Sequence, residues 1–123
     1  MLLDSNIIIY AVKPDYPKVR SFVKQRDVIA SAISRTETLG YHDLGETEAA
    51  KLDRLFELLT VQSITESVID RSIKLRRRRK SVKTTDAIVA ATALELESSL
   101  ATHNTDDFDW IDELDVIDPV SDE

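Results

Sequence analysis

The chain of 123 residues, 42% of them hydrophobic, is long enough for one domain with a single core and too short for two. It contains no cysteine, which excludes disulfides and thiolate metal sites, and no apolar stretch approaches the ~20 residues that span a bilayer. The net charge of −7 argues against a protein that coats nucleic acid non-specifically. The absence of cysteine fits the cytosol, and the expectation is a cytoplasmic protein without membrane association. Because the N-terminus lacks the basic region of a signal peptide, we expect residues 2–10 to belong to the folded structure.

The first ten residues combine a short apolar run with a single acid. Leu2 and Leu3 lead into Asp4, and the apolar pattern resumes at Ile7. This pattern predicts a buried strand that ends in a carboxylate, followed by a buried helical turn. Ligands collect at the carboxyl ends of parallel strands, so Asp4 is placed to build a site. It is equally well placed to cap the following helix, and the residues leave both interpretations open.

Beyond this start, the chain alternates between helix and strand patterns. Helix patterns begin near Pro17, Ser34, Leu52, Thr65 and Thr84. The apolar segments 28–33, 61–64, 100–102 and 114–117 predict short strands between them. The alternation predicts an α/β domain over residues 1–119, with a mostly parallel sheet between two layers of helices. A frayed acidic tail is expected at residues 120–123.

The last two helix patterns carry expectations about burial. In the helix that starts near Thr65, we expect four side chains to face the core, namely Val68, Ile69, Ile73 and Leu75. The following helix, over residues 86–96, has almost no polar face, so we expect it to be buried nearly all round.

Acidic residues recur where strands end and helices begin. Asp4 follows the first strand, Glu37 lies in the first turn after the second, and Asp86 opens the buried helix. Asp106 and Asp107 follow the strand at 100–102. Right-handed crossovers place strand ends and the following helix starts on one side of a parallel sheet. We therefore expect these carboxylates at one edge.

Each acid taken alone also has a structural interpretation. Ser34 and Glu37 match a capping box, Asp86 can favour the positive end of its helix, and Asp107 can be a solvated turn residue. Several like charges at one edge raise one another's pKa, which a chain tolerates mainly when a cation neutralises them. Because the candidate ligands are all carboxylate oxygens, the pattern suits Mg²⁺ or Mn²⁺ and disfavours zinc.

Other catalytic arrangements find less support. The two histidines are His42 and His103, and His103, beside a predicted strand, is the better candidate to touch a substrate. Gly40 and Gly45 are the two glycines, so the sequence has no glycine-rich phosphate loop. It also has no nucleophile elbow for a serine triad.

Four stretches in order resemble the successive motifs of PIN-domain proteins, and their length and order are similar to VapC-type toxins of prokaryotic toxin–antitoxin pairs. The stretches are residues 2–6, 34–37 with 39–41, 84–93, and 100–104 with 107–108. The resemblance spans residues 2–119. It implies a three-layer α/β/α fold, Mg²⁺- or Mn²⁺-dependent endoribonuclease activity, a homodimer, and a cognate antitoxin that occupies the acidic groove until it is degraded.

The resemblance also assigns roles to individual residues. The metal-binding and catalytic acids would be Asp4, Glu37, Asp86 and Asp107, with Asp106 as the alternative fourth acid; supporting polar groups would be Asn6, Asn104 and Thr85. In this hypothesis Asp4 and Asp86 ligate the first metal and Glu37 orients the attacking water. Asp107 would serve a second metal or an outer-shell water.

Half of the 16 lysines and arginines fall within residues 71–83, here called the basic segment. Its members are Arg71, Lys74, Arg76, Arg77, Arg78, Arg79, Lys80 and Lys83. Basic groups at a helix C-terminus are ordinarily stabilising, but four consecutive arginines exceed that need. We expect residues 76–80 and Lys83 to bind RNA phosphates or the antitoxin beside the acidic edge.

Two other functional classes remain open. A receiver-like or phosphoryl-transfer protein also carries an aspartate after its first strand, although Asp4 lacks the second aspartate of the usual phosphatase loop. A non-catalytic partner-binding module would use the same acids to hold an antitoxin arginine, with no metal.

Overall fold

The computed structural model describes residues 1–120, and most of the expected tail (121–123) lies outside the described residues. The strands are β1 (Leu2–Leu3), β2 (Ile29–Ser31), β3 (Thr60–Gln62), β4 (Leu100–Ala101) and β5 (Val116–Ile117). The helices are α1 (Ser5–Ala11), α2 (Pro17–Lys24), α3 (Ala32–Leu39), α4 (Glu46–Leu58), α5 (Glu66–Arg78) and α6 (Thr84–Glu95), with a 3-10 turn η1 (Thr105–Asp107).

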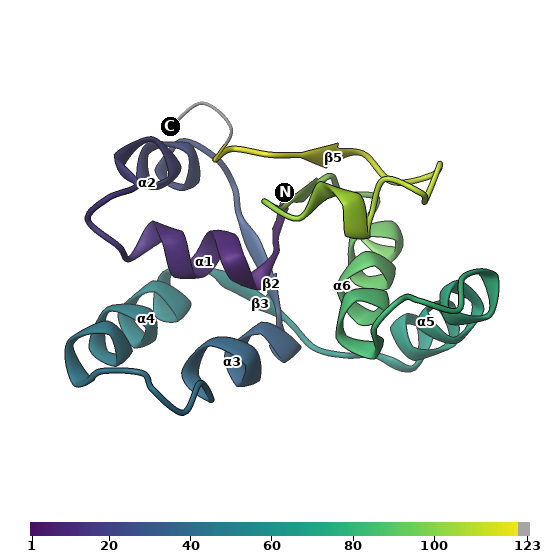
Figure 1. Ribbon diagram of the computed structural model, residues 1–123, viewed down its shortest axis with the longest axis horizontal. Helices are drawn as coiled ribbons and strands as arrows, with labels where there is room; N and C mark the ends of the chain where they lie inside the picture. Colours follow the sequence, from purple (N-terminus) through teal and green to yellow (C-terminus); the bar gives the residue numbers. More distant parts are fainter. Residues whose placement is uncertain (121–123) are drawn as a thin grey trace.

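All five strands form one sheet in the order β3-β2-β1-β4-β5, and every pair is parallel. Figure 1 shows α1, α2 and α4 on one side of the sheet and α5 and α6 on the other. The predicted three-layer α/β/α architecture is confirmed. Each crossover returns the chain to the same end of the sheet, so the carboxyl ends of the strands meet along one edge.

The central strand β1 divides the core in two. Its two residues are completely buried, and because alternate strand residues face opposite sides, Leu2 joins one hydrophobic cluster and Leu3 the other. The Leu2 cluster contains Phe108 and the buried face of α6, while the Leu3 cluster contains Val19 of α2 and Leu52 of α4. Asp4 follows directly, so its position is set by the centre of the sheet.

The buried helix α6 behaves as its composition predicts. Its apolar residues from Ala87 to Ala93 are buried, and it packs along α5. The expectation for α5 is only half right. Val68 and Leu75 are buried, but Ile69 and Ile73 are 39% and 45% exposed, because the buried stripe runs through Ser72 instead.

Helix boundaries differ from the sequence prediction at two places that matter for the site. Helix α3 begins at Ala32 with Ser31 as its N-cap, so the strand at 28–33 is shorter than expected and Ser34 lies inside the helix. The capping-box interpretation of Ser34 and Glu37 is therefore wrong. Helix α6 begins at Thr84 after Lys83, with no side-chain cap. Among residues 1–120, no helix combines the length and apolar character required to cross a bilayer.

Candidate active site

Asp4 occupies the end of β1 and is almost completely buried, with 7% of its surface exposed. Its Oδ1 accepts a hydrogen bond from the backbone N–H of Ser5 (2.9 Å), and its Oδ2 accepts one from the Thr102 hydroxyl (2.7 Å). Asp4 is thus the N-cap of α1, as the structural interpretation predicted. Burial raises its pKa, and the charges of Glu37 and Asp107 raise it further, against the lowering effect of the two hydrogen bonds.

Glu37 is held toward this edge from α3 by a serine pair. The Ser5 hydroxyl lies 2.8 Å from Glu37 Oε1 and 2.9 Å from Ser34 Oγ. A hydroxyl has one proton, so if Ser5 donates to the carboxylate it accepts from Ser34. Ser34 lies one helical turn before Glu37, on the same side of α3. The chain Ser34–Ser5–Glu37 orients an exposed carboxylate whose neighbours are buried.

Asp86 stands in the first turn of α6 and is half-buried. Its pKa is raised to about 6. Desolvation by burial is the largest cause, the charges of Asp4, Asp107 and Glu37 raise the pKa further, and the charge of Lys83 lowers it. Asp4, Glu37, Asp86 and Asp107 therefore share one electrostatic environment, although they come from four separate stretches of the chain.

The fourth acid comes from η1, which follows β4. Asp107 is the member of the adjacent pair whose charge raises the pKa of both Asp4 and Asp86. Phe108 anchors this turn, because its side chain is 1% exposed within the Leu2 cluster. Asp106 and Asp107 are both exposed on this turn, so exposure does not distinguish them. The electrostatics thus favour Asp107 over Asp106 as the acid that belongs to the cluster.

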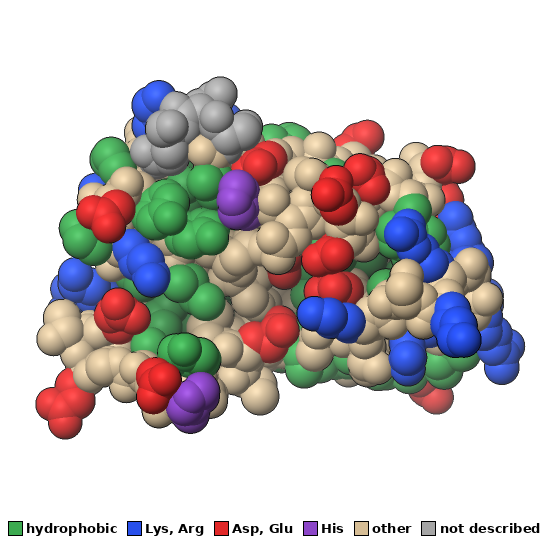
Figure 2. Space-filling model, viewed as in Figure 1, with side chains coloured by type: hydrophobic (Ala, Val, Ile, Leu, Met, Phe, Trp, Pro, Cys, Tyr) green, Lys and Arg blue, Asp and Glu red, His purple; other side chains and the backbone are tan. Residues whose placement is uncertain are grey.

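The four acids have the ligand chemistry that a divalent cation requires, but they are not arranged as a complete coordination site. Carboxylate oxygens suit Mg²⁺ or Mn²⁺, and a cation would relieve the repulsion that raises these pKa values. Within residues 1–120, however, no three acidic or histidine side chains are arranged so as to ligate one ion together. Direct ligation by several acids therefore requires side-chain movement or bridging waters. Figure 2 shows acidic side chains gathered near the middle of this face, with Lys and Arg concentrated over α5.

The supporting residues lie at different depths around the cluster. Asn6 spans the two strand ends: its side chain donates to Thr102 Oγ1 (3.4 Å), while its Oδ1 accepts from the backbone N–H of His103 (3.2 Å). Asn104 contributes its backbone N–H to Thr102 Oγ1 (3.1 Å), and its side chain is exposed. Thr85 is half-buried one residue before Asp86.

The two histidines lie in other surroundings. His103 pairs with Asp118 (3.2 Å), and its ring meets Tyr10 edge-on. His42 pairs with Asp43 (3.1 Å) on an exposed loop. Neither is placed by these contacts among the four acids.

The sequence prediction missed Ser5, Ser34 and Thr102 as members of the hydrogen-bond network. Thr102 is fully buried and lies 98 residues from Asp4 in the chain, so no local pattern connects them. A parallel pairing of the first and fourth predicted strands would have placed Thr102 beside Asp4. Ser34 was identifiable only as the residue three before Glu37.

Replacing Thr102 with valine should destabilise the protein by about 1–3 kcal/mol, because the buried Asp4 carboxylate loses its hydroxyl donor without gaining water. Urea unfolding followed by circular dichroism measures the change. Thr102→Ser, which keeps the hydroxyl, should cost clearly less. Equal losses in the two variants would show that the methyl group, and not the hydrogen bond, supports Asp4.

The raised pKa of Asp86 makes stability depend on pH. Between its ordinary value of 3.8 and about 6, the folded state holds a proton that the unfolded state releases, so the free energy of unfolding falls as pH rises through this window. The full shift corresponds to about 3 kcal/mol, which solvent screening of a half-exposed carboxyl reduces to roughly 1–2 kcal/mol. In the absence of divalent ions, Asp86→Asn should therefore have a Tm a few degrees above wild type at pH 7 and not at pH 4. A pH-independent difference would contradict this origin.

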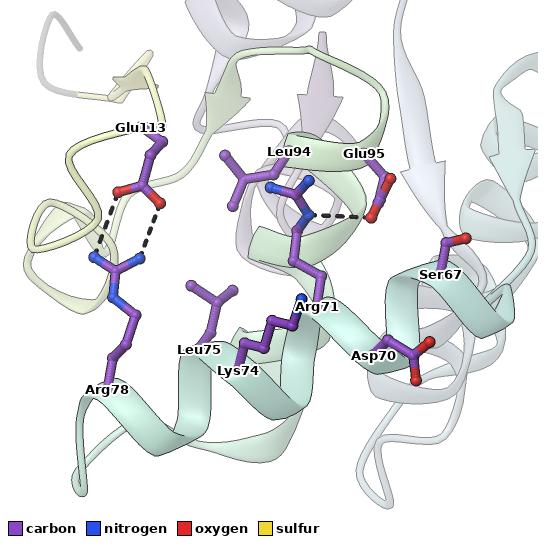
Figure 3. A pocket seen from close by; sticks show the side chains of 9 residues that line it. All are labelled: Ser67, Asp70, Arg71, Lys74, Leu75, Arg78, Leu94, Glu95 and Glu113. Atoms are coloured by element: carbon purple, nitrogen blue, oxygen red, sulfur yellow. Dashed lines mark hydrogen bonds and ion pairs between the residues drawn. The ribbon is translucent and has the colours of Figure 1, made fainter.

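The basic segment covers the C-terminal half of α5 and the turn into α6. Arg71 pairs with Glu95 (3.1 Å) and Arg78 with Glu113 (2.9 Å), so two of its members are partly neutralised. Figure 3 shows these two pairs on either side of a groove of about 470 Å³ that has Leu75 and Leu94 among its lining residues. Other members of the segment (Arg76, Arg77 and Lys80) are exposed and make no ion pair within the described part of the chain.

The chain thus combines an all-parallel sheet between two layers of helices with four electrostatically coupled carboxylates. A family model for the PIN domain matches residues 1–114, and the chain belongs to this family. PIN domains are generally nucleases that use divalent metal ions. Among curated proteins, no relative matches the chain by sequence.

Solved structures with the same fold cover nearly the whole chain. A toxin–antitoxin complex from Klebsiella pneumoniae matches with 26% identity and a TM-score of 0.76, covering 96% of each chain. VapBC-1 from nontypeable Haemophilus influenzae matches with 26% identity and a TM-score of 0.80, again over 96% of each chain. FitAcB from Neisseria gonorrhoeae, at 24% identity and a TM-score of 0.80 over 96% of each chain, shares the fold.

Proposed function

We propose that the protein is a Mg²⁺- or Mn²⁺-dependent endoribonuclease that acts as the toxin of a cytoplasmic toxin–antitoxin pair. The observation that carries this proposal is the mutual coupling of Asp4, Glu37, Asp86 and Asp107 at the carboxyl edge of the sheet. Repulsion among these acids is a cost to the folded state that a divalent cation removes. Membership of the PIN family and the similarity to toxin–antitoxin complexes support the same conclusion.

The four acids take distinct roles in this proposal. Asp4 and Asp86, whose pKa values are raised, hold the cation, and Asp107 completes the cluster from η1. When bound, the cation neutralises phosphate oxygens and acidifies water. Glu37 is exposed yet fixed by Ser5, so it orients the attacking water. Asn6 and Thr102 keep Asp4 in place, and Thr85 and Asn104 border the pocket.

The basic segment supplies the attraction for RNA that an acidic pocket lacks. Residues 76–78 form the last turn of α5, residues 79–80 follow it, and Lys83 lies close enough to Asp86 to lower its pKa. Phosphate binding by these side chains gives an affinity that weakens steeply with salt. Reversing the charge of Arg76 and Arg77, which make no ion pair within residues 1–120, should weaken RNA binding and reduce the salt slope by roughly one for each phosphate that is no longer bound. The same slope in the variant would remove these two arginines from the RNA path.

Two protein partners complete the proposal. An antitoxin would cover the acidic edge, as the similarity to toxin–antitoxin complexes suggests. A homodimer would cover the partly exposed Ile69 and Ile73 on α5. Sedimentation of the wild type beside an Ile73→Glu variant tests the second point, since a dimer through this surface should dissociate when a charge is introduced.

The deciding experiment is an RNase assay with the purified protein. RNA fragments should form with Mn²⁺ or Mg²⁺ and not with EDTA. The ion should also stabilise the wild type and raise its Tm, because an ion at one hundred times its Kd adds about 2.7 kcal/mol to the free energy of unfolding. Calorimetric titration with Mn²⁺ separates the second candidate, a partner-binding module without metal. That candidate is favoured by the lack of a preformed three-ligand cage within residues 1–120, and it predicts no binding heat.

A further inference from the structure

Trp110, the single tryptophan of the chain, contacts both the basic segment and the turn that carries Asp107. Its Nε1–H donates to the backbone carbonyl of Asp107 at 3.0 Å, so the indole is fastened to the turn that carries the fourth acid. The side chain packs against the Leu2 cluster and remains partly exposed. This tryptophan has no role in holding a cation or in the hydrogen bonds around Asp4.

Two guanidinium groups from the end of α5 lie over the indole. The Cζ atoms of Arg78 and Arg79 are 5.4 and 5.5 Å from the ring centroid. These distances lie within the range of cation–π attraction but exceed a stacking contact. Arg78 is fixed by its two hydrogen bonds to Glu113. Arg79 is exposed, and its Nε makes a hydrogen bond to Ser81 (3.2 Å), so it is the more easily displaced of the two.

We propose that Trp110 is a nucleobase-stacking subsite for single-stranded RNA, with Arg79 as the phosphate contact of the same nucleotide. The subsite deepens the proposed ribonuclease function and rests on it. A base that stacks on the face of the Trp110 ring displaces the guanidinium of Arg79, which then pairs with the adjacent phosphate. Aromatic faces bind bases of any identity, and an unpaired base is free to leave its neighbours, whereas a base in a duplex is already stacked.

The position of the Trp110 ring determines where the RNA backbone next to a stacked base lies. Because Trp110 is bonded to the backbone of Asp107, a base stacked there lies beside the acidic cluster, and the attached phosphodiester is directed along the edge between Asp107 and the basic segment. The subsite thus sets which phosphate reaches the acids. It selects for strand openness and not for sequence.

The single tryptophan provides a direct test by its own fluorescence. The wild type is titrated in EDTA with a 2′-O-methyl oligoadenylate of about eight nucleotides, so that no cleavage occurs, and with an abasic oligomer of the same length and charge. The oligoadenylate should quench the emission and the abasic oligomer should not. Equal quenching by both, or binding of the oligoadenylate without quenching, would overturn the subsite.

Variants at Trp110 separate stacking from folding. Binding is followed by the anisotropy of labelled oligoadenylate. Trp110→Phe, which keeps an aromatic face, should bind within about threefold of wild type, and Trp110→Leu should lose on the order of tenfold. Thermal unfolding shows whether each variant is folded. If Trp110→Leu does not fold, the quenching experiment on the wild type still tests the subsite. Undiminished binding by a folded Trp110→Leu would refute the proposal. Quenching without any RNA cleavage under Mn²⁺ would instead refute the ribonuclease function and leave the stacking subsite intact.

Discussion

Asp86→Asn should lower RNA cleavage by at least about 100-fold under saturating Mn²⁺ or Mg²⁺. Changes to residues that merely support a metal ligand typically cost 10–100-fold, and Asp86 is proposed to be a ligand itself. The substitution keeps the size of the side chain and removes the charge that Asp4 and Asp107 oppose. The variant should therefore remain folded while it loses activity. Initial rates of cleavage of a fluorogenic RNA, measured at several ion concentrations, give the result.

The adjacent acids of η1 provide a matched control for this experiment. Both side chains are exposed, but the charge of Asp107, and not that of Asp106, is among the main causes of the raised pKa values of Asp4 and Asp86. Asp107→Asn should reduce cleavage strongly, and Asp106→Asn should leave it within a few-fold of wild type. If Asp106→Asn is the damaging change, the fourth acid has been assigned to the wrong residue. If Asp86→Asn cleaves as fast as wild type, the proposed roles of all four acids fail together.

Phe108→Ala should cost about 3–5 kcal/mol of stability, the largest loss that we expect from a single substitution near the site. The ring is 1% exposed and fills the cluster formed by Leu2 and the buried face of α6. Truncation leaves a cavity beneath η1, so the turn that carries Asp107 loses its anchor. We expect the Tm to fall by roughly 10–20 °C in calorimetry.

A leucine at the same position distinguishes packing from the aromatic character of the ring. Phe108→Leu refills most of the space and should cost only about 1 kcal/mol. The two variants should also differ in activity below their transition temperatures, because only the alanine frees η1 to move. A small loss for Phe108→Ala would mean that the neighbouring side chains collapse into the cavity.

The sequence predicts the acidic edge well because parallel topology leaves it little freedom. Once the first and fourth strands are parallel and each is followed by a turn or helix, Asp4 and Asp107 must emerge on the same side. The charge coupling of Asp4 with Asp86 agrees with this expectation. Whether the acids hold a metal stays a prediction, since the ligand geometry depends on side-chain rotamers that no pattern encodes.

The errors have a common physical origin in long-range packing. Ile73 follows helical spacing and is nonetheless 45% exposed, because the face that α5 presents to α6 is chosen by the rotation of the whole helix. Ser34 matches a local capping motif, yet it bonds to Ser5, which is 29 residues away in the chain. Local rules compete with interactions of this kind and cannot rank them.

The pairing of β1 with β4 joins residues nearly one hundred positions apart, as Leu2 lies opposite Leu100. During synthesis Asp4 leaves the ribosome well before Thr102, which follows it by 98 positions, and before η1. Strand pairings between residues so far apart in the chain also form late in folding, because closing the long loop costs conformational entropy before the contacts can form. A chain that ends before β4 therefore lacks both the Thr102 hydroxyl and the Asp107 carboxylate, and the surroundings of Asp4 are complete only when residues 100–107 have joined the sheet.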